Sequence, residues 1–206
     1  MRRDVGSTMR SPDPEEVVRR IMKDYRSFLA EVLIPEEALK ARLKELGDEI
    51  SRDYAGKTIT AICILKGGVM FLTDLIRNIK PPVAIDFMSV SSYGVGSRSS
   101  DGEVRITLDL TISIAGQHVL IVEDIIDSGH TLHSVMEMLR TRNPASLNVC
   151  TLLDKVSRRE VHVPVKYSGF EIPNKFVFGY GLDMDEYYRN LPFIGVVDLE
   201  KYEADD

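Results

Sequence analysis

The chain has 206 residues, 44% of them hydrophobic and 28% charged, which is enough to bury one substantial core. Its formal net charge of −6 argues against general nucleic-acid binding, and the sequence has no run of the ~20 apolar residues that a membrane span needs. Cys63 and Cys150 lie in apolar, strand-like runs, so we expect two buried thiols in a cytoplasmic protein rather than a disulfide or a metal site.

Two helices are predicted near the amino-terminal end, after a beginning that is polar and irregular. Asp13 to Glu16 has the features of a helix start: an N-cap aspartate, a proline in the first turn and a capping-box glutamate. Apolar residues recur at helical spacing from Val17 to Val32, and we expect this helix to pack on the protein's own core, on a sister subunit or on a partner. Pro35 to Tyr54 predicts a second amphipathic helix, which ends near Gly56.

A strand, a glycine turn and a helix follow. Ile59 to Leu65 predicts an apolar strand and Val69 to Ile79 a helix, with Lys66-Gly67-Gly68 between them. Two glycines at the carboxyl end of a strand allow a ligand to approach the backbone closely, and Lys66 adds a positive charge. The alternative is a plain connecting turn with a solvated lysine.

The next two strands enclose a long polar loop. Val83 to Val90 predicts a strand, and the alternation from Val104 to Ile112 predicts a second one that returns antiparallel with one face in water. Residues 91–102 between them are rich in glycine and serine, so they cannot pack a core. A loop of this length is usually functional or disordered, and an idle surface loop is the alternative.

A buried strand with an acidic end forms the centre of the pattern. Val119 to Val122 is continuously apolar, which is typical of a parallel-sheet strand with both faces covered. Glu123 and Asp124 follow at its carboxyl end, and after the polar turn 127–131 the apolar residues from Leu132 to Leu139 recur at helical spacing. In open α/β sheets, ligands bind in the crevice at this edge.

The residues of this turn suit a phosphorylated sugar. Ser128, Gly129 and Thr131 offer hydroxyls and a flexible backbone at the start of a helix, where free amides favour a phosphate. Glu123 and Asp124 would repel that phosphate unless Mg²⁺ bridges them to the ligand or they accept hydrogen bonds from sugar hydroxyls. The alternative is a capped helix beside two solvated acids.

The carboxyl-terminal part has a looser pattern. Leu147 to Leu153 predicts another buried strand, which ends at Asp154-Lys155. Short strand-like pieces then alternate with proline, glycine and asparagine, and we expect a small subdomain over the sheet edge, built from residues 161–165, 167–172, 176–178 and 194–199. Spacing alone does not single out Asp183 or Arg189 in this part.

The stretch Val-Leu-Ile-Val-Glu-Asp-Ile-Ile-Asp-Ser-Gly-His-Thr at 119–131 closely resembles the phosphoribosyl pyrophosphate motif of the type I phosphoribosyltransferases, in the form of the hypoxanthine(-guanine) branch. Leu65 to Gly68 resembles the family's pyrophosphate-binding loop, which often contains a non-proline cis peptide. Residues 171–192, from Glu-Ile-Pro-Asn-Lys-Phe to Arg-Asn-Leu-Pro, resemble its purine-binding hood. The likeness runs from about residue 33 to about residue 199.

The resemblance implies an α/β fold with a parallel-sheet core and a small hood subdomain. Residues 1–33 would be a partly helical extension, and residues 34–206 a single domain. Its core would cover about 55–155, with the hood built from the amino-terminal helix region and about 156–206.

The resemblance also implies how the sugar donor is held. Glu123 and Asp124 would hold the ribose hydroxyls and Mg²⁺, and Asp183 would help to hold a second Mg²⁺. Ser92 and Tyr93 would begin a mobile lid. The expected contacts of phosphoribosyl pyrophosphate are Lys66, Gly67, Glu123, Asp124, Asp127, Ser128, Gly129, His130, Thr131 and Arg189.

On the purine side, the resemblance implies that Lys155 holds O6, Phe176 stacks on the ring and the Val177 backbone reads its edge, with Asp183 in the same pocket. Asp127 would face N7 as the general base or acid. His130 departs from the lysine or other polar residue of many relatives, which makes the grip on the phosphate pH-dependent or leaves only the backbone amide in use.

The expected activity is therefore transfer of the phosphoribosyl group to N9 of hypoxanthine or guanine, in a Mg²⁺-dependent homo-oligomer. Two alternatives stand beside it: a regulatory protein of the same fold that senses the ribose donor, and a transferase that prefers xanthine. The acidic charge disfavours a DNA-binding regulator.

Overall fold

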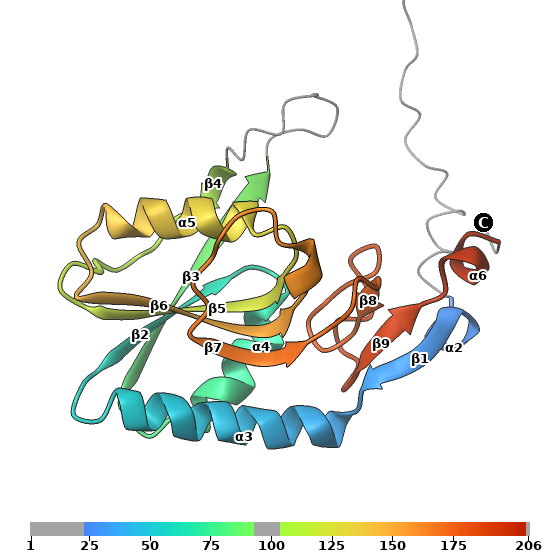
Figure 1. The fold of residues 1–206 in the computed structure, drawn as a ribbon, viewed down its shortest axis with the longest axis horizontal. Helices are drawn as coiled ribbons and strands as arrows, with labels where there is room; N and C mark the ends of the chain where they lie inside the picture. The colour runs from blue at the N-terminus through green and yellow to red at the C-terminus, as the bar shows by residue number, and fades with distance from the viewer. Residues whose placement is uncertain (1–22, 93–103, 205–206) are drawn as a thin grey trace, which may run out of the picture.

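Strand β5, His118–Ile126, lies inside a six-stranded sheet (Figure 1). The computed structural model describes residues 23–92 and 104–204. The strand order is β4-β3-β2-β5-β6-β7, with β4 antiparallel to β3 and the others parallel. The remaining strands of the sheet are β2 Ile59–Ile64, β3 Val83–Ser92, β4 Val104–Leu108, β6 Ser146–Asp154 and β7 Tyr167–Glu171.

Helices cover both faces of this sheet, which explains why its central strands are continuously apolar. Helices α3, Glu36–Asp53, and α4, Gly68–Ile76, pack with Leu120 and Val122 of β5 in one core cluster. Helix α5, His130–Arg140, packs with Val119 and Ile121 in another, and Figure 1 shows it on the opposite side of the sheet from α3. The predicted α/β fold with a mostly parallel sheet is confirmed.

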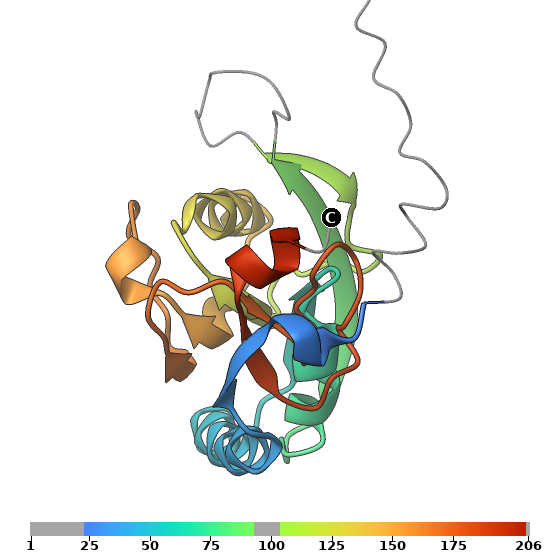
Figure 2. The same ribbon diagram turned by 90° about the vertical axis from the view of Figure 1, so that its right-hand side faces the viewer.

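A small second sheet forms the hood, and Figure 2 shows it from the side where α2 and α6 lie. Its order is β1-β9-β8 and all its pairs are antiparallel. Phe28 and Phe178 pack with residues of the carboxyl-terminal helix in a separate aromatic cluster. The elements of the hood are α2 Tyr25–Phe28, β1 Leu29–Ile34, β8 Val177–Phe178, β9 Ile194–Val197 and α6 Leu199–Ala204.

The helix expected from Val17 to Val32 is wrong in its last part. Only Tyr25–Phe28 is helical among its described residues, and Leu29–Ile34 is instead strand β1, paired with β9. Val32, which a helix would have turned inward, is 45% exposed. Pairing with a distant strand has overridden the helical spacing here, and residues 13–22 lie outside the described part of the chain.

Three other expectations change in the carboxyl-terminal and edge regions. β7, expected in the hood, pairs with β6 and so extends the core sheet. Residues 161–165 form no strand, because Glu160 and Val161 donate to the Ser128 carbonyl while Val163 turns into the core. Strand β4 stops at Leu108, because the Thr111 and Ile112 amides donate to the buried Asp86 carboxylate instead of continuing a ladder.

The parallel register brings three loops to one edge of the sheet. Val122 of β5 lies beside Cys63 of β2 and Cys150 of β6, so the strands end at a common level. The turns after β2, β5 and β6 therefore meet, as expected for a ligand-binding edge. The Leu65–Lys66 peptide in the first of these turns is cis.

Cys63 and Cys150 are both fully buried free thiols, and burial raises the pKa of Cys63 to about 12. Within residues 23–92 and 104–204, no helix is long and apolar enough to cross a membrane. Of the expected lid residues, Ser92 ends β3, whereas Tyr93 lies outside the described residues.

Candidate active site

A cavity of about 220 Å³ opens where β5 ends and α5 begins. Most of the turn predicted to bind the sugar phosphate lines it, so one concave site contains both the acids and the helix start. The lining residues are Glu123, Asp124, Ile125, Ile126, Asp127, Ser128, Gly129, Thr131 and Leu132.

The turn before α5 is shaped for an anion at the helix start. Gly129 has φ +91°, which strains any residue with a side chain, and a Cβ there would lie 3.2 Å from the Val161 carbonyl oxygen, a tight contact. No side chain caps α5, whose first-turn amides have no intrahelical acceptor. The imidazole of His130 instead pairs with Glu160, Nε2 to Oε2 2.9 Å, so its backbone amide is the group that belongs to the turn.

Glu123 and Asp124 are half-buried, and their charges are unfavourable as they stand. Burial, together with the neighbouring Asp124 charge, raises the pKa of Glu123 well above its ordinary value. Burial also raises the pKa of Asp124, although the Ile125 amide and the charge of Arg189 act against this. Two desolvated neighbouring carboxylates can interact favourably with a cation or with hydroxyl donors.

The protein alone does not complete a metal site in the described part of the chain. No cluster of three or more His, Cys, Asp or Glu residues is placed there to hold an ion. Asp183 pairs with Arg189, Oδ1 to Nη2 2.9 Å, and does not join Glu123 and Asp124 as a third metal ligand. Mg²⁺ usually keeps several water or substrate oxygens, so Glu123 and Asp124 fit a metal that arrives with its ligand.

The glycine turn after β2 lies directly against these acids. A Cβ on Gly67 would fall 1.5 Å from Oδ2 of Asp124, so no other residue fits there without a shift. From the other side, a Cβ on Gly181 would lie 2.1 Å from the Gly67 carbonyl oxygen. Gly67 is thus enclosed between the acidic strand and the hood.

Asp127 lies between two cations that come from the turn after β6. Its Oδ2 accepts from Lys155 Nζ at 2.9 Å, and its Oδ1 accepts from Arg158 Nε at 3.2 Å. Partial burial acts to raise the pKa of Asp127, but hydrogen bonds and charges from Lys155 and Arg158 outweigh it and hold the pKa below its ordinary value. Lys155 is itself buried, whereas Asp127 is one of the residues that line the cavity.

The hood holds two further predicted site residues, Phe176 and Arg189, neither of which lines the cavity at the start of α5. Phe176 is 50% exposed just before β8, whereas Val177 is buried within it. Arg189 donates from Nη1 to the Gly181 carbonyl at 2.8 Å and contacts both Asp183 and Glu186 through Nη2. Glu186 also accepts from Lys66 Nζ at 2.8 Å, which joins the hood to the glycine turn.

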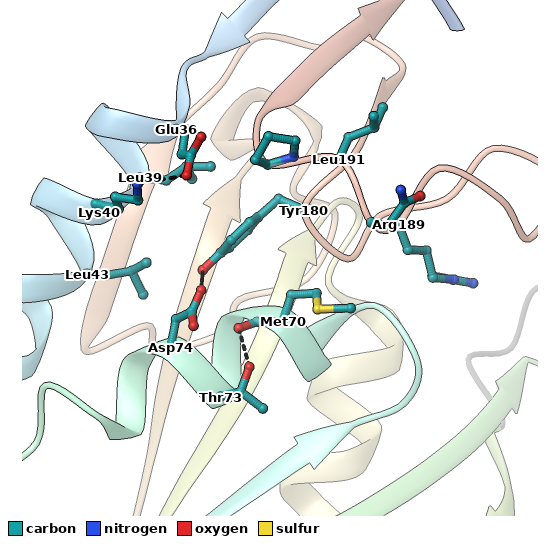
Figure 3. Close-up of a pocket in the computed structure, with 12 residues that line it drawn as sticks. Glu36, Leu39, Lys40, Leu43, Met70, Thr73, Asp74, Tyr180, Arg189 and Leu191 are labelled. Atoms are coloured by element: carbon teal, nitrogen blue, oxygen red, sulfur yellow. Dashed lines mark hydrogen bonds and ion pairs between the residues drawn. The ribbon is translucent and has the colours of Figure 1, made fainter. Parts of the chain in front are cut away.

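A second cavity, also of about 220 Å³, lies between α3, α4 and the hood (Figure 3). The Tyr180 hydroxyl crosses it to Asp74 of α4 at 2.7 Å, while the Arg189 side chain points away from that pair. Apart from Arg189, none of the predicted site residues lines it. The Tyr180–Asp74 bond fixes the hood to the helix that follows the glycine turn.

Arg158, Glu186 and Tyr180 are site or support residues that the sequence did not indicate. Arg158 lies three residues after Lys155 and one turn of helix further on, a spacing that predicts a shared direction once Lys155 is chosen. Glu186 and Tyr180 gave no comparable signal, because their partners are 120 and 106 residues away.

The comparisons with known proteins agree with one another. The model of the phosphoribosyl transferase domain matches residues 33–185. The hypoxanthine phosphoribosyltransferase of Haemophilus influenzae is 52% identical over 174 residues, which is 83% of this chain and 97% of the relative. The hypoxanthine-guanine phosphoribosyltransferase of Staphylococcus aureus is 49% identical over 174 residues, 84% of this chain and 97% of the relative.

Among solved structures, a hypoxanthine phosphoribosyltransferase from Staphylococcus aureus superimposes with a TM-score of 0.83 at 48% identity. The match covers 88% of this chain and 98% of that one. Fold and sequence similarity therefore extend over nearly the whole of these relatives.

The Lys155–Asp127 ion pair predicts how the Asp127 carboxyl titrates. In Lys155→Met the carboxylate loses its nearer cation, so its pKa should rise, which a ¹³C NMR titration of the aspartate carboxyl would measure. A carboxyl with a lowered pKa stabilises the fold above the ordinary aspartate pKa, and this contribution is lost as the pH falls from that value through the lowered pKa. The stability gap between wild type and variant should therefore narrow on acidification.

Lys40→Met is the matched control, because Lys40 is an exposed lysine that pairs with Glu36 and Glu37 on α3. It should leave the Asp127 titration unchanged. An Asp127 pKa that is the same in Lys155→Met and wild type would contradict the described role of the ion pair.

Proposed function

We infer, because this chain belongs to the phosphoribosyltransferase family, that it moves the phosphoribosyl group of phosphoribosyl pyrophosphate to N9 of hypoxanthine or guanine. The products are the purine nucleoside monophosphate and pyrophosphate. The relatives near 50% identity carry this activity in their names, and this chain covers 97% of their length.

The donor would bind with its 5′-phosphate in the turn formed by residues 127–131. The amides at the start of α5 point a partial positive charge at this position, and Gly129 keeps the backbone open to the ligand. Glu123 and Asp124 would accept hydrogen bonds from the ribose hydroxyls on one side. This places the sugar between the acids and the helix start.

Mg²⁺ would supply charge neutralisation on the departing pyrophosphate when it is bound. Glu123 and Asp124 are the residues that would hold it together with donor oxygens, because they are neighbouring carboxylates that line the cavity. Asp183 would support a second ion from the hood side. Lys66 and Arg189 would meet the pyrophosphate oxygens directly.

The purine would lie between the hood and the Lys155–Asp127 ion pair. Phe176, half exposed, offers its ring for stacking, and the Val177 backbone would read the edge of the base. Lys155 would donate to O6 and Asp127 would face N7. In the reaction the bond from C1 to the pyrophosphate oxygen breaks as N9 bonds to C1, and Asp127 manages the proton that the purine gives up.

The observation that carries this proposal is the Lys155–Asp127 pair, 2.9 Å apart at the end of the acidic strand. It puts a donor suited to a purine carbonyl beside a carboxylate suited to a purine proton. Lys155 is buried, and burying a lysine is costly unless it serves a paired site. The arrangement therefore supports catalysis on an oxopurine.

The direct test is nucleotide formation from phosphoribosyl pyrophosphate and hypoxanthine, guanine or xanthine in competition. We expect a nucleoside monophosphate from hypoxanthine or guanine in the presence of Mg²⁺, and loss of the activity when the metal is chelated. If the protein binds the donor but releases no nucleotide with any of the three purines, the proposed activity is wrong.

Asp127→Asn should lower kcat by roughly 10²- to 10⁴-fold, because the amide cannot take up the purine proton. The KM values for both substrates should change little, since the amide keeps the shape of the site and can still accept a hydrogen bond. Steady-state kinetics with each substrate varied would separate the two effects.

Asp48→Asn is the control for this variant, because Asp48 is a similarly exposed aspartate paired with Lys80 away from the cavity. It should behave as wild type. Unchanged turnover in Asp127→Asn would remove Asp127 from the proton transfer while leaving the rest of the proposal standing.

A further inference from the structure

Glu186 pairs with two cations, Lys66 of the glycine turn and Arg189 of the hood. Its Oε2 lies 2.8 Å from Lys66 Nζ and 3.2 Å from Arg189 Nη2. One carboxylate oxygen of Glu186 is thus paired with two cationic side chains. A carboxylate oxygen that bridges a lysine and an arginine makes the contacts that a phosphate oxygen would make.

The backbone around Glu186 is held in place by the hood. Asp185, Glu186 and Tyr188 all have left-handed φ values, of 49°, 72° and 65°, which non-glycine residues adopt only when the surroundings impose it. The Glu186 amide donates to Oδ2 of Asp183 at 2.9 Å.

The neighbours on either side of Glu186 are also bound. Asp185 accepts from the Tyr202 hydroxyl, and the Tyr188 hydroxyl donates to the Lys23 carbonyl at 2.8 Å. The loop is therefore anchored on both sides of Glu186 to the outer layer of the hood.

The side chain, in contrast, is free to move. Glu186 has 63% of its side chain exposed and Lys66 has 67%, so the contact can break without unpacking anything. Arg189 is different: 21% exposed and bonded to the Gly181 carbonyl and Asp183, it keeps its position when Glu186 leaves. The anchored loop holds the Glu186 backbone within reach of both cations.

We propose that Glu186 is an internal competitor for pyrophosphate: its carboxylate occupies Lys66 and Arg189 and must be displaced when the diphosphate group of a ligand binds there. This inference rests on the proposed function and adds a residue that sets the affinity of its donor and product. Glu186 lowers that affinity and favours release of pyrophosphate after transfer.

The expected effect is modest, because exposed ion pairs are weak. Glu186→Gln keeps the size of the side chain and the hydrogen bond from the backbone amide to Asp183, but it removes the competing charge. Pyrophosphate should bind roughly three- to tenfold more tightly to this variant than to wild type, which corresponds to the loss of two exposed ion pairs.

The test is calorimetric titration of magnesium pyrophosphate into the full-length protein at saturating Mg²⁺, so that a change in metal affinity does not contribute. Glu45→Gln is the matched control: Glu45 is also 63% exposed and also pairs with an arginine three residues away, but on α3. It should bind pyrophosphate as wild type does.

A second variant shows whether the gain comes from the freed cation. In a Lys66→Met background, Glu186→Gln should improve pyrophosphate binding by a smaller factor, since only Arg189 remains to be released. An undiminished gain there, or equal or weaker binding in the single variant, would overturn the competitor role.

These measurements separate the role of Glu186 from the proposed transferase activity. If wild type forms nucleotide but Glu186→Gln does not bind pyrophosphate more tightly, only the role of Glu186 falls. If wild type neither forms nucleotide nor binds magnesium pyrophosphate, the proposed function falls and this inference falls with it.

Discussion

Two adjacent carboxylates, Glu123 and Asp124, lie half-buried at the end of the central strand, and the rest of the site is arranged around their unfavourable charge. Burial and mutual repulsion raise the pKa of Glu123 well above its ordinary value. Gly67 has no side chain because Asp124 fills the space that its Cβ would need. A metal ion would therefore stabilise these two carboxylates, at the position where a metal-bound sugar diphosphate would dock.

The other acids of the site already pair with cations of the protein. Asp127 holds Lys155 and Arg158, while Asp183 and Glu186 hold Arg189. Two of these cations are ones that the proposed substrates would use: Lys155 on the purine carbonyl and Arg189 on the pyrophosphate. A ligand that binds Lys155 or Arg189 would therefore compete with the protein's own carboxylates.

The sequence predicts those features that depend on local pattern. Val119 to Val122 is continuously apolar because helices cover both faces of the sheet, so the strand and the crevice beside it could be placed. Leu29–Ile34 could not, since its apolar spacing fits a helix and only pairing with β9 decides the matter. Lys155 and Asp127 are joined across 28 residues, and only the family resemblance put them in one site. From the sequence alone, Glu186 and Arg158 cannot be told from solvated surface charges, because Lys66 and Asp127, their partners, lie far away in the chain.

The most direct test of this account is the free energy of unfolding of the Glu123→Gln/Asp124→Asn double variant, measured by denaturant titration without metal. Neutral amides of the same shape remove the repulsion and the cost of burying charge, so the variant should be at least as stable as wild type, while binding of magnesium phosphoribosyl pyrophosphate is lost. A variant that is markedly less stable than wild type and still binds the donor would show that these acids serve the fold rather than the ligand.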